Sequence, residues 1–281
     1  MKPRPATGRR LTNAVVSVLA TLSAVLGMVM LVWIVWVVLE RGLGAFNLDF
    51  FTKLPTPPGM EGGGLVNAIL GTLVMTLLAT LIAVPLGLLG GVYLAEFGEG
   101  SRLADNTRFS ANVLMGMPSI IIGVFAYALV VVPLGKFSGY AGIVALAILM
   151  LPIAARTTED MLRLVPNTLR EAALALGAPR WRITLDIVFR AAKTGLITGI
   201  LLAVARVSGE TAPLLFTALN SPYLMSSLGQ PTPNLTVTIF NYAMSPYADW
   251  QQKAWGASLL ITAGVLTLTL VTRYILGERK T

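Results

Sequence analysis

The chain has 281 residues, of which 55% are hydrophobic and only 12% are charged. A soluble domain carries about 25% charged residues. A water-facing surface could not be wetted with half that share, so the composition excludes a soluble globular protein and indicates a membrane protein. The formal net charge is +8. The basic residues gather at the two ends and in one interior segment, which fits contact with anionic membrane lipid and argues against nucleic acid as a partner.

Cysteine and histidine are both absent. A chain without cysteine forms no disulfide, and the missing thiolate and imidazole ligands argue against a zinc or haem site. We therefore expect no metal site.

Long apolar runs dominate the sequence. The first, residues 11–39, is free of charge and far longer than the apolar core of about 7–15 residues in a secretory signal, so it is predicted to span the membrane and stay there. A spanning helix needs about 20 mainly apolar residues. Five more runs have this length, at about 65–95, 111–135, 137–155, 194–219 and 254–276. We predict an all-α membrane protein in which residues 1–281 form one transmembrane domain of six helices.

Prolines and paired glycines indicate that these helices pack as a bundle. Proline is tolerated in a spanning helix when neighbouring helices satisfy the carbonyls that it frees. Glycines four residues apart let two helices approach closely, and helix packing is a sufficient explanation for both pairs here, Gly87 with Gly91 and Gly195 with Gly199.

The basic residues predict the orientation. The segment 156–193 and both chain ends are rich in lysine and arginine. An even number of spans places all three on one side, and the positive-inside rule makes that side the cytoplasm. The basic residues of the two ends are Lys2, Arg4, Arg9, Arg10, Arg273, Arg279 and Lys280.

The loop 156–193 is predicted to contain two short helices. Thr157 with Asp160 is a capping pattern, and Pro166 would stop the helix that it begins. Asn167 would cap a second helix that Gly177 ends.

The second helix carries a narrow apolar stripe with helical spacing. Its members are Leu169, Ala172, Ala173 and Leu176. The stripe is too small to form a core, so the helix either lies on the lipid surface or projects into the cytoplasm toward a partner.

The same helix resembles the EAA motif of ABC importer permeases. The matching residues are Glu171, Ala172, Ala173, Gly177 and Ile187, while Phe189-Arg190 stands where the motif usually has Leu-Pro. The resemblance implies a type I importer permease whose coupling helix docks on an ATPase. The chain itself lacks the Gly-x-x-x-x-Gly-Lys-Ser/Thr loop that cradles nucleotide phosphates. We therefore expect no catalytic residue and no bound cofactor here, with ATP and magnesium used by a partner.

The fifth apolar run contains two charges, Arg206 and Glu210. An arginine near the bilayer centre costs roughly 2.5–3.5 kcal/mol on insertion scales, so one that is retained usually faces a bundle interior or an aqueous cavity. In a continuous helix Glu210 would share its face and lie within reach of a salt bridge. The pair either ties helices together or offers the guanidinium to a passing anion.

Several longer strings resemble the permeases of phosphate-specific ABC importers, and the PstA type more than the PstC type. They are MPSIIIGVF from Met117, RTTEDMLRLVPNTLREAALALGAPRW from Arg156, RVSGETAPLLFTALNSP from Arg206, and TIFNYAMSP and QQKAWGASL near the end. The resemblance implies that Arg206 and Glu210 are pore charges. Ser119 and Ser208 are candidate hydroxyl donors to phosphate, although bonding to the backbone of their own helix would explain each equally well.

The outer connections, 40–64 and 219–253, are dense in proline and glycine and are predicted to be irregular. The second connection is expected to be partly re-entrant or helical around Thr236–Met244, because its apolar residues cannot be left in water. The family resemblance implies that these loops meet a phosphate-loaded binding protein.

The sequence thus predicts the channel-forming permease of an ATP-driven phosphate importer in a bacterial inner membrane. The implied partners are a homologous PstC-type subunit, two ATP-binding subunits and a periplasmic or extracellular phosphate-binding protein. Two alternatives stay open: a permease for another oxyanion such as sulfate or molybdate, and an anion transporter or channel that works without ATP.

Overall fold

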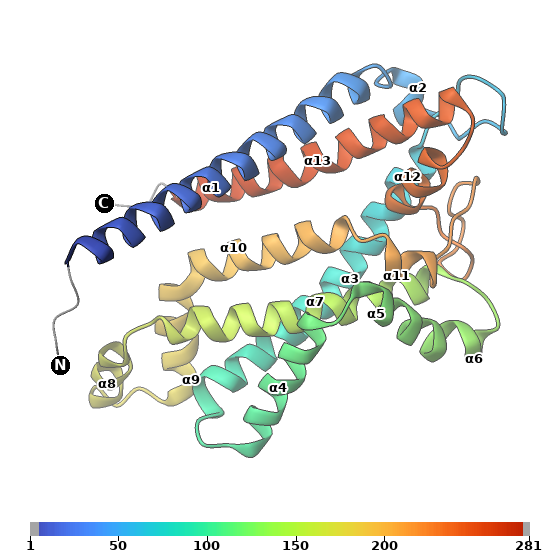
Figure 1. Ribbon diagram of the computed structural model, residues 1–281. Coiled ribbons are helices and arrows are strands. Elements are labelled where there is room, and N and C mark those ends of the chain that lie inside the picture. The colour runs from blue at the N-terminus through green and yellow to red at the C-terminus, as the bar shows by residue number, and fades with distance from the viewer. Residues whose placement is uncertain (1–5, 278–281) are drawn as a thin grey trace.

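The structure is a computed structural model that describes residues 6–277, and all regular secondary structure of that part is helical (Figure 1). The longer helices are α1 (Ala6–Leu43), α3 (Val66–Val92), α4 (Arg102–Gly116), α7 (Gly139–Arg163), α10 (Phe189–Ser208) and α13 (Ala248–Gly277). The shorter ones are α2 (Leu48–Thr52), α5 (Ser119–Ala126), α6 (Val132–Leu134), α8 (Asn167–Ala175), α9 (Arg180–Arg182), α11 (Ala212–Leu215) and α12 (Leu235–Ala243). Three π-helical turns, η1 (Tyr93–Phe97), η2 (Tyr127–Val131) and η3 (Ile183–Val188), continue α3, α5 and α9.

Five helical segments are long and apolar enough to cross a membrane, with a sixth if a bent pair is counted as one span. The five are Arg10–Leu43, Val66–Phe97, Gly139–Arg163, Arg180–Ser208 and Ala248–Val271. The all-α membrane fold predicted from the sequence is therefore confirmed. Hydropathy identifies such segments well because the bilayer core offers no water to an unpaired backbone group.

Two predicted spans differ from the observed helices. The run 111–135 is not one straight helix, because α4 and the segment Ser119–Leu134 meet at an angle of 105°. Pro118 lies at the corner, and proline restricts the residue before it to an extended conformation. The run 194–219 also breaks: α10 ends at Ser208, and Pro213 sits in the separate helix α11.

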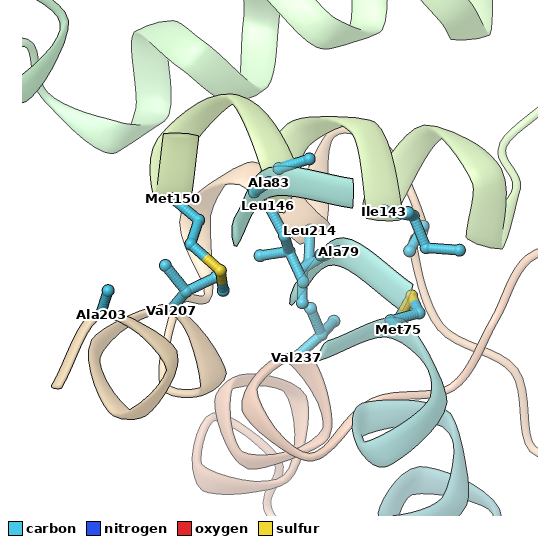
Figure 2. Close-up of a cluster of buried hydrophobic side chains, with 12 residues drawn as sticks. Met75, Ala79, Ala83, Ile143, Leu146, Met150, Ala203, Val207, Leu214 and Val237 are labelled. Atoms are coloured by element: carbon cyan, nitrogen blue, oxygen red, sulfur yellow. The ribbon is translucent and has the colours of Figure 1, made fainter. Parts of the chain in front are cut away.

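α7 is the central helix of the bundle. It packs along both α3 and α10, while α13 lies between α10 and α1 (Figure 1). Figure 2 shows the main apolar cluster, to which α3, α7, α10, α11 and α12 all contribute. Its members are Met75, Ala79, Ala83, Ile143, Leu146, Ala147, Met150, Ala203, Val207, Leu214, Ala218 and Val237.

Different helices lie at the two ends of the bundle. The start of α1, the far end of α13 and the short helix α8 lie at one end, and α2 and α12 lie at the other (Figure 1). The three basic segments of the chain thus begin or end on the same side of the bundle.

The paired glycines pack helices together as predicted. A Cβ atom on Gly91 would lie 2.4 Å from the Cβ of Thr158 and 2.6 Å from the carbonyl oxygen of Ala155 on α7. A Cβ on Gly199 would lie 2.0 Å from Cγ2 of Thr157. Only glycine permits these distances, so α3 approaches the backbone of α7 closely at Gly91, and α10 receives the Thr157 side chain of α7 at Gly199.

We predict that Gly91→Ala destabilises the folded chain, whereas the neighbouring change Gly90→Ala does not. A Cβ on Gly90 would meet only the Cβ of Ala155, at an ordinary 3.8 Å. Both changes gain the same helix propensity, so the difference reports overpacking against α7, which costs about 1–3 kcal/mol. The thermal unfolding midpoint in detergent measures it, and equal midpoints for the two variants would contradict the packing described.

Candidate coupling helix and substrate pathway

α7 continues through the residues that were predicted to cap a new helix. It runs unbroken to Arg163, so the predicted helix start at Thr157 is wrong. Thr157 packs against Gly199 instead of capping. A capping pattern acts only where the chain leaves a preceding irregular segment, and nothing between Gly139 and Arg163 ends the helix.

The predicted second helix is present as α8. Its first residue is Asn167, preceded by Pro166 with no side-chain cap, so Asn167 begins the helix without capping it. Gly177 has φ of +78° and ends the helix as expected: the N–H of Gly177 donates to Leu174 O and the N–H of Ala178 to Ala173 O, both at about 3 Å.

α8 presents most of its apolar stripe to solvent. Ala173 is buried against the protein, whereas Leu169 is 44% and Leu176 is 89% exposed. Ala172 is exposed as well, as are Glu171 and Gly177. Exposed small and apolar residues on a short projecting helix form a surface suited to another protein.

Arg170, one residue before this motif, fixes α8 to the bundle. Its guanidinium donates to the Glu96 carboxylate through Nη2 at 2.7 Å and through Nε at 3.2 Å. It also donates to the carbonyl oxygens of Val165 and Leu162, at 2.6 and 2.8 Å. The sequence analysis did not identify Arg170, because Glu96 lies 74 positions away and only the tertiary fold brings the two together.

A second ionic cluster surrounds Glu159, whose side chain has no exposed surface. Its Oε1 accepts from Arg108 Nε at 2.7 Å and lies 2.8 Å from Arg163 Nη2, and its Oε2 accepts from Arg156 Nη1 at 2.6 Å. Arg108 belongs to α4, so the cluster ties α4 to the end of α7. The i, i+3 and i, i+4 spacing of Arg156, Glu159 and Arg163 was a usable signal in the sequence.

Arg206 lies in the last turn of α10, because the helix ends two residues later. Its side chain is exposed, and within residues 6–277 it forms no ion pair or hydrogen bond. Glu210 lies past the helix end, where its backbone oxygen accepts from Thr236 Oγ1 at 2.9 Å. The salt bridge that a continuous helix would have allowed is therefore not formed, and a cation at a helix C-terminus is favourably placed without it.

The two candidate serines lie on different helices, Ser208 at the end of α10 and Ser119 at the start of α5. Ser208 Oγ donates to Ala205 O at 2.8 Å, which is bonding within its own helix. Ser119 is the first residue of α5. A Cβ on Gly123 of that helix would lie 2.6 Å from Cα of Pro213, so α5 packs directly on α11, just after Glu210.

The other end of the bundle contains an ordered cap. The helix expected around Thr236–Met244 is confirmed as α12, and the buried Asn234 caps it by accepting from the N–H of Val237 at 2.9 Å. Lys253 is buried, pairs with Asp249 at 2.6 Å and donates to Gly62 O, which holds the outer loop onto α13. The two connections are irregular outside α2, α12, the end of α1 and the start of α13, as predicted, and Lys253 attaches the first of them to α13.

A pocket of about 560 Å³ opens between these outer segments. Its lining combines prolines, amides and aromatic rings and contains no charged side chain: Leu54, Pro55, Thr56, Pro57, Pro58, Leu65, Asn67, Asn220, Ser221, Pro222, Tyr223, Thr238, Asn241, Tyr242 and Trp250. Burial and the nearby Asp249 raise the pKa of Tyr242 to about 12. The phenol is therefore protonated and neutral at neutral pH. Because no lysine or arginine lines the pocket, it offers no cation to an anionic solute.

Comparisons with known proteins agree with this architecture. Residues 83–277 match the family model described as "Binding-protein-dependent transport system inner membrane component". Solved permeases share the fold: an importer for the acidic polysaccharide alginate has a TM-score of 0.65 over 97% of this chain and 100% of that one, at 11% identity. The MetNI methionine ABC transporter has a TM-score of 0.59 over 75% of this chain and 94% of that one, at 22% identity. The chain is thus a permease component of the binding-protein-dependent transporters.

Relatives of known name define the family more narrowly. A phosphate transport system permease protein PstA from Yersinia pestis is 48% identical over 97% of this chain and 92% of that protein. A probable phosphate transport system permease protein PstA from Methanocaldococcus jannaschii is 37% identical over 86% of this chain and 82% of that protein. The chain belongs to the PstA family of phosphate transport system permease proteins.

We predict that Glu159→Ala lowers the free energy of unfolding by about 1.5–3 kcal/mol, because it removes the shared partner of three guanidinium groups whose side chains are 18%, 26% and 52% exposed. The adjacent change Asp160→Ala is the control. Asp160 is 55% exposed and lies 3.5 Å from Arg156, and an exposed pair of this kind contributes about 0–1 kcal/mol. Denaturant titration of the purified chain in detergent separates the two, and an equal loss in both variants would contradict the buried cluster.

Proposed function

We propose that this chain is the permease subunit of an ATP-driven importer of inorganic phosphate. The observation that carries the proposal is Arg206: an exposed guanidinium without an ion pair among the described residues, on a membrane-spanning helix of a PstA-family chain. Its five N–H donors match the oxygens of a phosphate in geometry and charge. An arginine already neutralised by Glu210 would offer less to an anion.

The importer proposed here has two permease subunits, this chain and a PstC-type partner, with the pathway between them. Arg206 would face that pathway, and the break at Gly209 leaves Glu210 close in sequence but off the helix. In another conformation Glu210 could compete with phosphate for Arg206 and so favour release. The exposed surface of Arg206 in the single chain supports this arrangement.

Two ATP-binding subunits would supply the energy by docking on α8. The exposed Ala172 and Leu176 support this contact, as does the resemblance of Glu171–Gly177 to the EAA motif. The basic segments begin or end at the same end of the bundle as α8 (Figure 1), which supports a cytoplasmic position for both termini. A phosphate-binding protein would then meet the opposite end, where α2 and α12 lie.

Phosphate uptake by cells that lack the gene tests the substrate and the site together. Complementation with wild type is expected to restore uptake of radiolabelled phosphate but not of sulfate. Arg206→Gln is expected to lower phosphate uptake by about tenfold or more, because it removes a charged donor worth roughly 1.5–3 kcal/mol. Its unfolding free energy should change by less than about 0.5 kcal/mol, since Arg206 has no partner to lose within residues 6–277.

Arg190→Gln is the matched control, because Arg190 is 79% exposed on the same helix. It should transport like wild type. Uptake of sulfate but not phosphate by the wild type would identify another oxyanion as substrate. An Arg206→Gln variant that transports normally, or one that is strongly destabilised, would show that Arg206 has a structural role.

A second prediction concerns α8. Leu176→Arg is expected to reduce co-purification of the ATP-binding subunits by about tenfold or more, because a charge in the centre of a docked apolar surface is costly to desolvate. Leu103→Arg, at an exposed leucine in the first turn of α4, is the control and should co-purify normally. Normal recovery of the ATP-binding subunits with Leu176→Arg would exclude this face as the docking surface.

A further inference from the structure

The cytoplasmic end of α3 is joined to α8 by one ion pair. The π-helical turn η1 continues α3 without a break and carries Glu96. The Glu96 carboxylate meets Arg170 of α8 through two guanidinium nitrogens, Nη2 at 2.7 Å and Nε at 3.2 Å. The side chains are only 10% and 17% exposed, so the pair is largely shielded from water and from salt.

Arg170 uses its remaining donors on the end of α7. It donates to Val165 O and Leu162 O, so that one side chain joins α7, α8 and η1. From the other side, Arg108 Nη2 donates to Leu94 O at 2.7 Å while its Nε holds Glu159. Arg108 and Arg170 thus bind η1 at Leu94 and at Glu96, two residues apart, and connect it to α4, α7 and α8.

α3 extends from this junction into the main apolar cluster. Ala83 of α3 belongs to the same cluster as Ala203 and Val207 of α10, and Met150 of α7 lies beside Val207 (Figure 2). Val207 is the immediate neighbour of Arg206. Between Ala83 and η1, α3 is continuous apart from Pro85, which removes one backbone hydrogen bond, and close contacts at Gly87 and Gly91 hold this stretch against α7. A displacement of η1 therefore reaches the packing that surrounds the proposed phosphate contact.

We propose that Glu96 and Arg170 are the positioning residues through which α8 moves α3 and so couples ATP use to phosphate movement. The inference rests on the proposed function. Neither residue touches phosphate or ATP; their role is to make α8, the end of α7 and η1 move as one unit. Without the ion pair, α8 still docks on the ATP-binding subunits, but a movement of α8 no longer displaces α3.

The test is the number of phosphate ions transported per ATP hydrolysed by the complete importer in proteoliposomes with its loaded binding protein. Glu96→Ala is expected to hydrolyse ATP while its phosphate-to-ATP ratio falls by about fivefold or more, the lower range of ordinary coupling between sites. Glu96→Asp, which keeps the charge, should retain more of the ratio than Glu96→Ala. Glu99→Ala is the matched control, since Glu99 is exposed and unpaired within residues 6–277 and lies three positions away; its ratio should equal that of wild type.

A cross-link tests the same link independently of the stability of Glu96→Ala. The chain has no cysteine, so Glu96→Cys with Arg170→Cys supplies the only two thiols in this subunit. The unlinked double variant should be uncoupled, and a short bis-methanethiosulfonate that joins the two thiols should bring the ratio back toward the wild-type value. A linked importer that transports no better than the unlinked one would overturn the proposal, as would a Glu96→Ala variant with a wild-type ratio.

A ratio that stays normal while ATP hydrolysis and transport fall together in Glu96→Ala would also overturn it, because the pair would then serve folding alone. Failure of the proposed function is a separate outcome. It would be seen as a wild-type importer that moves no phosphate, and the ratio would then be measured with whichever anion the wild type does transport.

Discussion

The Glu159 carboxylate, buried among Arg108, Arg156 and Arg163, is the interaction on which the arrangement of the α8 end of the bundle depends. One fully buried acid against three bases is tolerable only because each oxygen is bonded. It fixes α4 to α7 and leaves Arg108 Nη2 free to bind the backbone of η1. Arg170 then completes the frame in which α8 projects. The central helix α7 is thus held by charge at this end and by close glycine contacts and apolar packing along its length.

This distribution explains a contrast among the arginines. Each guanidinium nitrogen of Arg108 and of Arg170 donates at least one hydrogen bond within the protein, and both side chains are mostly shielded from solvent. Arg206 donates no hydrogen bond within the described part of the chain, and its side chain is exposed. Structural arginines of a membrane protein are satisfied within the fold, since an unpaired charge in the membrane is costly. Arg206 lacks such a partner within residues 6–277, and this is the observation behind the role proposed for it.

Much of the fold could be predicted, because a segment that spans the bilayer must be a long apolar helix and can be recognised from its own residues. Apolar length identified the spanning helices, Gly177 predicted the end of α8, and the apolar residues near Thr236 predicted α12. Hydropathy reports how long an apolar run is, however, and not whether the run forms one straight helix. It therefore could not show the sharp bend at Pro118 or the end of α10 before Glu210. The Thr157 pattern was misleading because a local capping signal has no effect inside a helix that the surrounding packing continues.

The site was predictable to a lesser degree. Arg206 stood out as a charge in an apolar run, and the α8 motif stood out as a family signature. The Glu96–Arg170 and Arg108–Glu159 pairs could not be found in one sequence, because their partners are 74 and 51 positions apart. Ion pairs at such separation depend on tertiary contacts between helices, which periodicity does not encode.

The most direct test of the account is whether Arg206 faces the phosphate pathway in the assembled importer. Because the chain has no cysteine, Arg206→Cys places the only thiol of this subunit at that position, with the partner subunits also made free of cysteine. The account predicts modification by a membrane-impermeant thiosulfonate and slower modification in the presence of the phosphate-loaded binding protein and a non-hydrolysed ATP analogue. A thiol that reacts in the isolated subunit but never in the assembled importer would place Arg206 in a subunit contact and contradict the account.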